Sequence, residues 1–303
     1  MTESTDRSDP VGTPDDRDDR EALRPTLLRG QVSYKPRGMV FDLFGDFVNP
    51  RAAGLPLRAI TEFLSLFGTS ASTVRVVMAR LRRDGWLDTK RSGRETSYFL
   101  NDRSLRVLSE GRSRILERSI GRWDGNWYLL IYSVPETERH LRDALRKELA
   151  WLGYGALASG TWISPHDQSL RAKEWLVTSG DIRFEFLTCQ TGSLAQDREL
   201  AGRCWDLASL NDRYAKWITR FQEVASAPAG AITGAEALVT RMKVTHEYRQ
   251  FPFADPMLPR ELLFPDWKGE EAYELLLTIR ANLDEEANRF FEQVVRGNQS
   301  PDR

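Results

Sequence analysis

Apolar residues recur at helical spacing in three successive segments near the start of the chain, which predicts three amphipathic helices. The first segment is MVFDLFGDFVNP, which Pro50 ends. The second is LPLRAITEFLSLFG, where Gly68 is expected at the C′ position. The third is ASTVRVVMARLRRDG, with its N-cap expected at Thr69-Ser70. Its expected buried stripe consists of Ala71, Val74, Met78 and Leu81.

The hydrophobic period changes to two after the third helix, which predicts a β-hairpin. The segments WLDTK and ETSYFL flank the turn RSGR, with Gly93 in the turn. Three helices with a tight connection between the second and the third, followed by a basic hairpin, are typical of a winged helix-turn-helix domain. The basic segment NDRSLRVLSEGRSRILERSIGR is predicted to form a helix that leads out of this domain.

A second pattern starts near Arg122 and alternates strands with helices. NWYLLIYSVP, GALASGTWISP and IRFEFLTCQ are predicted strands, and ETERHLRDALRKELAWLG and LRAKEWLVTSG are predicted helices. This order favours an α+β sandwich of ferredoxin-like type. From about Ala201 the chain is predicted to be helical, with GRCWDLASLNDRYAKWITRFQEV in one helical register. A proline-rich ordered loop, PFADPMLPRELLFPDWKG, then precedes a long amphipathic helix.

The fold class predicted from these patterns is α+β, and the chain divides into five parts. The first part is strongly acidic and almost free of apolar residues, so it cannot offset its chain entropy by burial and is expected to be disordered. The parts are a tail (1–33), a winged-helix DNA-binding domain (34–100), a linker helix (101–121), a ferredoxin-like central domain (122–196) and a helical C-terminal domain (197–303).

Composition narrows the possible functions. The chain has 303 residues with 43 Lys and Arg against 44 Asp and Glu, so affinity for nucleic acid requires a local basic patch. Cys189 and Cys204 form no CxxC pair and stand near no His pair, which argues against a disulfide scaffold and a zinc site. The sequence contains no apolar run of about 18 residues and no signal-peptide pattern, which favours a cytoplasmic protein without membrane contact.

A local basic patch lies between Ser70 and Arg94, where seven bases stand against two acids. The third helix of a winged helix enters the major groove, and the wing cations neutralise phosphates. Trp86 is expected to anchor the wing in the core rather than to stack on a base. Arg75 and Arg80 are candidates for base contacts, phosphate clamps or ion pairs within the chain. The candidate DNA-binding residues are Ser72, Thr73, Arg75, Val76, Ala79, Arg80, Arg83, Lys90, Arg91 and Arg94.

Signatures of enzymes are weak, and we predict no catalytic residue, metal site or cofactor. GYGALA matches the letters of a dinucleotide-binding fingerprint, but it follows a helix and precedes a strand, which is the wrong order. Walker A, G-x-S-x-G and HExxH patterns are not found. A metal-dependent nuclease of ferredoxin-like fold needs a carboxylate at the end of its first strand, where this chain offers Ser133, with Glu136 beyond the proline.

A second constellation occurs in THEYRQFPFADPMLP. His246, Tyr248 and Arg249 stand beside Phe251 and Phe253, and together they offer the groups that hold an anionic, partly aromatic small molecule. These three polar residues are the candidate effector-binding residues. The alternative is that this cluster of prolines and aromatic residues holds the helical domain together.

Six segments of the chain resemble a known family. They are VFDLFGDFVNPR, TVRVVMARLRRDGWL, GRETSYFL, RWDGNWYLLIYSVPE, LGYGALASGTWISP and HEYRQFPFADPMLPRELLFPDWKG. Together, and in this order from about Arg37 to Val295, they resemble PaaX-type transcriptional repressors of phenylacetic acid catabolism. The resemblance implies a winged helix, a central domain related to Cas2 and a helical C-terminal domain. It also implies a homodimer that binds a palindromic operator and is released by an aryl-CoA thioester, typically phenylacetyl-CoA.

The sequence therefore predicts a dimeric, sequence-specific repressor that binds double-stranded DNA. A small effector, an acyl-CoA, is expected to bind between the central and C-terminal domains. Two alternatives remain open. One is a metal-dependent nuclease that uses the central domain, and the other is an interaction scaffold whose winged helix has lost DNA binding.

Overall fold

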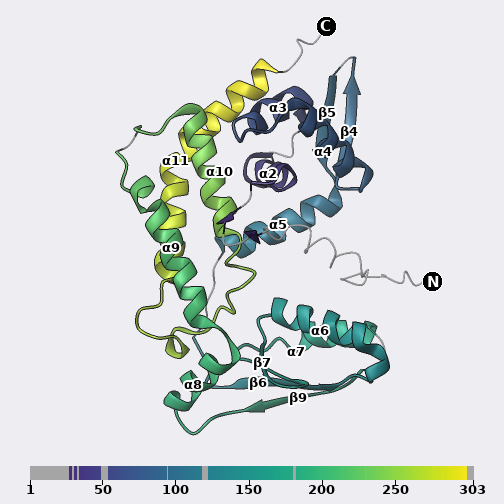
Figure 1. The fold of residues 1–303 in the computed structure, drawn as a ribbon, viewed down its shortest axis with the longest axis vertical. Helices are drawn as coiled ribbons and strands as arrows, with labels where there is room; N and C mark the ends of the chain where they lie inside the picture. Colours follow the sequence, from purple (N-terminus) through teal and green to yellow (C-terminus); the bar gives the residue numbers. More distant parts are fainter. Residues whose placement is uncertain are drawn as a thin grey trace, which may run out of the picture. The chain divides into compact units, whose positions relative to one another are not determined.

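The computed structural model describes residues 27–28, 31–32, 34–48, 54–93, 95–117, 122–179, 182–228 and 230–298. The chain forms two compact units (Figure 1). Unit 1 comprises Met1–Glu117, Ala227–Gln250 and Ile279–Arg303, and unit 2 comprises Arg118–Ser226 and Phe251–Thr278. Residues of the predicted C-terminal domain thus occur in both units. The predicted acidic tail lies outside the described residues, apart from the paired strands β1 (Leu27–Leu28) and β2 (Gln31–Val32).

The winged helix-turn-helix predicted from the sequence is present in unit 1. Its helices are α2 (Pro36–Leu43), which continues as the π-helical turn η1 (Phe44–Val48), α3 (Leu57–Ser65) and α4 (Ala71–Arg83). Its sheet has the order β3-β5-β4, formed by β3 (Leu55–Pro56), β4 (Leu87–Ser92) and β5 (Glu95–Leu100). Helix α5 (Asp102–Leu116) follows, as predicted.

Two glycines end helices of this domain. Gly68 has φ +74°, and the Thr69 N–H donates to the Leu64 carbonyl at 3.1 Å, which closes α3 with a Schellman motif and confirms the predicted C′ position. Gly85, with φ +72°, ends α4 in the same way, and the Trp86 N–H is the closing donor. The left-handed backbone at each position favours glycine, so the chain turns sharply into α4 and then into the wing.

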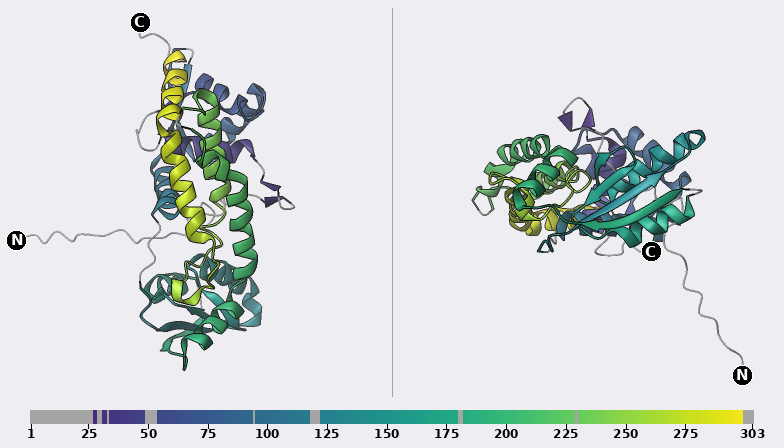
Figure 2. Two further views of the ribbon diagram at one scale, coloured as in Figure 1. Left: turned by 90° about the vertical axis from the view of Figure 1, so that its left-hand side faces the viewer. Right: turned by 90° about the horizontal axis from the view of Figure 1, so that it is seen from below.

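The core of unit 1 combines the winged helix with helices from the end of the chain. Helices α10 (Gly234–Tyr248) and α11 (Gly269–Gly297) lie side by side over the later part of α11 (Figures 1 and 2), and α10 packs on α2. The Phe291 ring of α11 stacks between those of Phe47 and Phe63, with centroids 5.1 Å from each. The winged helix therefore shares one core with the C-terminal helices.

Unit 2 contains the predicted ferredoxin-like fold. Its antiparallel sheet has the order β7-β8-β6-β9, formed by β6 (Trp127–Ser133), β7 (Gly155–Ala158), β8 (Thr161–Ser164) and β9 (Arg183–Cys189). Helices α6 (Arg139–Trp151) and α7 (Ser169–Thr178) lie on one face of it (Figure 1). The short 3₁₀ helix η3 (Glu136–Glu138) precedes α6. The order β-α-β-β-α-β confirms the predicted fold class.

Three local predictions were wrong. GALASGTWISP forms two strands, because Gly160, with φ +72°, turns the chain between them. The helix predicted across GRCWDLASL is interrupted between α8 (Leu194–Cys204) and α9 (Leu207–Ala225), where the Asp206 side chain caps α9 by accepting from the Ser209 N–H at 3.1 Å. Ala71 is exposed, because it lies in the first turn of α4, ahead of the buried stripe.

The remaining elements agree with the predictions. The proline-rich segment is a loop that contains the short 3₁₀ helix η4 (Arg260–Leu262), and a single long helix, α11, follows it. Within the described ranges, no helix is both long and apolar enough to cross a lipid bilayer.

Candidate nucleic-acid interface and the buried network beside it

Helix α4 starts with a cluster of hydroxyl groups. The Ser70 side chain is the N-cap and accepts from the Thr73 N–H at 3.2 Å, as predicted. Its Oγ also lies 2.9 Å from the hydroxyls of Ser72 and Thr73. The first turn carries no acidic residue, so the positive end of the helix dipole is not compensated there. This exposed helix start suits contacts with anionic groups.

Helix α4 has two distinct faces. Val74, Met78 and Leu81 are buried. The exposed positions on the other side follow the spacing i, i+3, i+4, and we call them the reading face: Ser72, Arg75, Val76, Ala79, Arg80 and Arg83. Val76 is a large apolar side chain with 50% exposure, which the packing of unit 1 does not use. The structure thus brings six of the predicted DNA-binding residues onto one solvent-facing stripe.

The arginines of the reading face have different neighbours. Arg83 pairs with Asp84 at 3.3 Å, and both side chains are exposed. Arg75 lines a surface hollow of about 500 Å³ together with Glu62 and Glu95. Arg80 makes no ion pair with any residue that the structure describes. Among the described residues, Arg75 thus shares its surroundings with two carboxylates, whereas Arg80 has no ion-pair partner.

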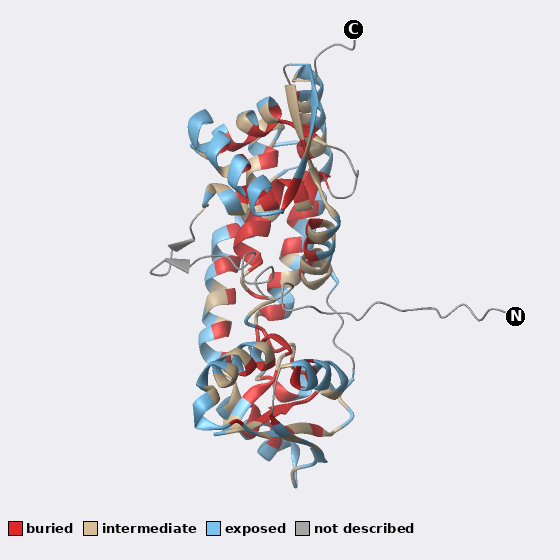
Figure 3. Cartoon of the chain, turned by 90° about the vertical axis from the view of Figure 1, so that its right-hand side faces the viewer, coloured by how far each residue is buried: buried red, intermediate tan, exposed pale blue. Residues whose placement is uncertain are grey.

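The wing carries the next group of predicted residues. Strands β4 and β5 pair in register from Leu87↔Leu100 to Ser92↔Glu95, and Gly93 turns the chain with φ +57°. Lys90 and Arg91 are exposed near the tip, and Arg91 Nε donates to the Gly93 carbonyl at 3.2 Å. Figure 3 shows that exposed positions gather toward the tip of the β4–β5 hairpin. Arg94, the last predicted contact, lies outside the described residues.

Trp86 anchors the wing in the core, as predicted. Its side chain is only 3% exposed and meets the Phe41 ring edge-on at 5.2 Å. The Arg103 guanidinium lies 4.5 Å from the indole centroid, and the buried Ser104 hydroxyl donates to the Trp86 carbonyl. Contacts from α2 and α5 thus fix the base of the hairpin next to the end of α4.

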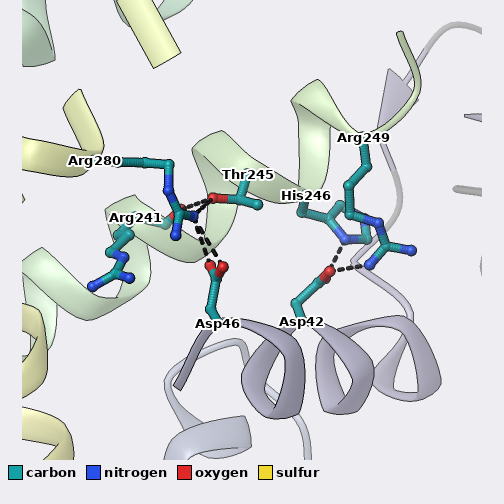
Figure 4. Close-up of polar contacts among 7 residues, drawn as sticks. All are labelled: Asp42, Asp46, Arg241, Thr245, His246, Arg249 and Arg280. Atoms are coloured by element: carbon teal, nitrogen blue, oxygen red, sulfur yellow. Dashed lines mark hydrogen bonds and ion pairs between the residues drawn. The ribbon is translucent and has the colours of Figure 1, made fainter. Parts of the chain in front are cut away.

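Two of the three candidate effector residues, His246 and Arg249, lie in a buried network between α10 and α2 (Figure 4). His246 Nδ1 lies 2.5 Å from Asp42 Oδ2, and Arg249 donates to the other oxygen of the same carboxylate. The Tyr248 side chain is buried as well. Two of the three residues therefore hold α2 against α10 through polar contacts, a structural role that the sequence interpretation did not predict. Their role in binding an effector stays a prediction.

A second buried carboxylate, that of Asp46 in η1, is held by an arginine in a similar way. Arg280 of α11 donates to both oxygens of Asp46, at 3.0 and 3.1 Å, and to the Thr245 hydroxyl at 2.6 Å (Figure 4). Arg241 is also buried, with its guanidinium 4.7 Å from the centroid of the Phe47 ring. We call the set Asp42, Asp46, Arg241, Thr245, His246, Arg249 and Arg280 the buried network.

Burial and nearby charges shift the pKa values of Asp42 and Arg241 in opposite directions. Burial by itself raises the pKa of Asp42, but Arg249 and His246 outweigh it, so the pKa lies below its ordinary value. Burial lowers the pKa of the Arg241 guanidinium, and Asp46 opposes that shift. The Asp42 carboxyl is therefore charged at neutral pH, and its charge is compensated inside the protein.

The sequence interpretation missed Asp42, Asp46, Arg241 and Arg280. A signal was available, because Asp42 and Asp46 are two acids one turn apart within the otherwise apolar segment MVFDLFGDFV. Acids on the apolar face of a helix are rarely buried without partners. Nothing in the local sequence identifies those partners.

The described residues contain no cluster of three or more His, Cys, Asp or Glu side chains arranged to hold a metal ion. Cys189 and Cys204 are free thiols, and burial raises the pKa of both.

Comparisons with known proteins cover nearly the whole described chain. Three family profiles match in order: "PaaX-like protein" over residues 35–104, "PaaX protein central Cas2-like domain" over 121–201, and "PaaX-like protein C-terminal domain" over 205–293. The Transcriptional repressor PaaX of Escherichia coli (strain K12) is 30% identical over 264 residues, which are 84% of this chain and 83% of that protein.

A solved structure has the same fold. The uncharacterized protein Rv0674 from Mycobacterium tuberculosis matches with a TM-score of 0.61 and 23% identity, over 85% of this chain and 99% of that one. At this identity the likeness concerns the fold alone.

Proposed function

Because the chain belongs to the PaaX family of transcriptional repressors, we propose that it represses transcription by binding a palindromic operator as a homodimer. The reading face of α4 enters the major groove, and the wing cations contact the phosphate backbone. One helix from each protomer occupies successive grooves, about 34–36 Å apart.

The observation that carries this proposal is the composition of the reading face. Arg75 and Arg80 offer guanidinium groups that pair with guanine edges, and Val76 offers an apolar side chain suited to a thymine methyl group. Lys90 and Arg91 extend the positive surface onto the wing. In a chain with net charge -1, this local concentration of cations supports a dedicated anionic partner.

A small anionic effector, an acyl-CoA, releases the repressor. By linkage, it must bind more tightly to a dimer geometry whose reading helices no longer match the half-site spacing. A thermal-shift screen of CoA thioesters and free aryl acids identifies it, because a ligand of the folded state raises stability by RT ln(1 + [L]/Kd).

Fluorescence anisotropy with DNA from the protein's own promoter region tests the binding. Arg75→Ala is expected to weaken specific binding by about 1–3 kcal/mol if Arg75 contacts a base. Lys90→Ala should weaken binding to all DNA sequences about equally. Arg171→Ala, an exposed change on α7, is the control and should change neither specific nor unspecific DNA binding. Unchanged operator affinity of Arg75→Ala removes Arg75 from base reading. If the wild-type protein shows no specific binding to this DNA at low salt, the result contradicts the proposal and favours the scaffold alternative.

A further inference from the structure

A cavity of about 740 Å³ lies where the end of β6, helix α6 and the β7–β8 hairpin meet. Small-molecule sites typically enclose roughly 300–1,000 Å³. All residues that line the cavity belong to unit 2, so its walls are complete within that unit. None of the residues discussed above as DNA or effector contacts lines it.

The charged groups of the cavity are mainly positive. Arg142 and Arg146 lie one turn apart on α6, where like charges repel, and both line the cavity. Arg142 donates to Glu136 Oε2 at 2.7 Å. Arg146 is exposed and has no ion-pair partner among the described residues. Two guanidinium groups thus face one carboxylate, and Arg146 has a charge available for a ligand.

The opposite wall of the cavity is fixed by backbone contacts. The Tyr132 N–H donates to the Gly160 carbonyl at 2.8 Å. A Cβ at position 160 would lie 2.6 Å from the backbone carbonyl oxygen of Tyr132, so the close approach requires glycine. The β7–β8 register shifts between Ala156 and Ala158, so Leu157 stands outside the regular ladder. Tyr132 and Trp162 add aromatic surface to the lining. A preformed wall of this kind lowers the ordering cost of binding.

We propose that this cavity binds an organic phosphate. Its phosphate lies between Arg142 and Arg146, whose planar forks match phosphate oxygens, and its planar part lies against Tyr132 or Trp162. An anion at Arg249 must first displace Asp42, whereas an anion at Arg146 displaces no partner within the described residues. Naming this ligand as the effector rests on the proposed function, but the binding itself does not.

Isothermal titration of the full chain with ADP and inorganic pyrophosphate tests the site, with adenosine as the phosphate-free probe. Both phosphates should bind, and adenosine should bind far more weakly. Arg146→Ala should weaken ADP binding by about tenfold or more, because a charged hydrogen-bond donor is lost. Glu136→Gln should strengthen it, because a negative charge leaves the site. Arg139→Ala, an exposed change on the same helix that does not line the cavity, should leave it unchanged.

Three results overturn the proposal. The first is that neither ADP nor pyrophosphate binds. The second is that Arg146→Ala binds ADP with wild-type affinity. The third is that Arg139→Ala loses as much ADP affinity as Arg146→Ala, which indicates unspecific charge attraction. A separate titration with operator DNA distinguishes a nucleic-acid backbone as the occupant. If Arg146→Ala weakens DNA binding while ADP does not bind, the cavity serves DNA and the proposal fails. A wild type that binds ADP but no operator contradicts the proposed function alone.

Discussion

The two charged regions of unit 1 use the same residue types in opposite ways. On the reading face and wing, arginines and lysine are exposed, and the ion pair between Arg83 and Asp84 leaves 73% and 39% of the side chains accessible. Such a pair is worth about 0–1 kcal/mol. In the buried network, the Asp42 and His246 side chains are 1% and 3% exposed, so groups of the protein rather than water compensate the charge of the Asp42 carboxylate. Exposure, rather than charge, separates the arginines that we propose to contact DNA from those that hold the fold.

The largest effect should come from breaking the buried network. Asp42→Asn preserves the shape of the side chain but removes the buried carboxylate charge that pairs with Arg249, so the free energy of unfolding should fall by about 3–5 kcal/mol. Urea unfolding followed by circular dichroism measures it. Asp84→Asn makes the same chemical change at the exposed pair and should cost no more than about 1 kcal/mol. Equal losses in the two variants contradict the distinction between the regions.

A smaller effect, on binding rather than on stability, should come from the reading face. Arg80→Ala removes an exposed guanidinium without a partner in the described chain, so stability should change by less than about 0.5 kcal/mol. Specific operator affinity should fall by about 1–3 kcal/mol, measured by anisotropy against a scrambled sequence. Comparison with the affinity loss of Arg75→Ala then shows whether Glu62 and Glu95, which line the same hollow as Arg75, reduce the contribution of Arg75 to operator binding. A clear loss of stability in Arg80→Ala places this residue in the fold instead.

The smallest expected effect is on the pH dependence of stability, through the titration of Asp42. It is absent near neutral pH and grows on acidification. Its pKa in the folded protein lies below the unfolded value of about 3.9, so its stabilising contribution is fully present above about pH 4. The contribution is lost as the pH falls through the folded-state pKa. Urea unfolding between about pH 2.5 and 6 should therefore show a shallower acid loss for Asp42→Asn than for the wild type. Parallel curves contradict a lowered pKa of Asp42.

Local patterns predicted most of the fold and which positions of α4 and the wing are exposed. Helical spacing placed α2, α3 and α4, the glycine after SLF gave the turn into α4, and the change to period two gave the wing. Trp86 was identified as an anchor because an apolar residue stands between two basic stretches. These features depend on residues that are close to one another in the sequence, so a short segment contains every residue needed to predict them.

The buried network could not be predicted in this way. His246, Arg249 and Arg280 are separated from their carboxylate partners by 204, 207 and 234 residues. Periodicity is evaluated over windows of roughly 11–18 residues, so it identifies an unusual acid but not the group that compensates it. For the same reason the sequence could not show that His246 and Arg249 contact Asp42, since a polar residue that lines a pocket and one that pairs with a buried carboxylate look alike in sequence.

The aromatic stack of Phe47, Phe291 and Phe63 bears on how this DNA-binding module could be inherited or transplanted. The ring from near the end of the chain completes a core that residues 35–104 begin. A gene fragment that encodes only those residues would deliver a reading helix with an open apolar face and two carboxylates stripped of Arg249 and Arg280. A change of the proposed operator specificity is therefore expected to arise by substitutions on the surface of α4, with the whole chain retained, rather than by exchange of the N-terminal segment.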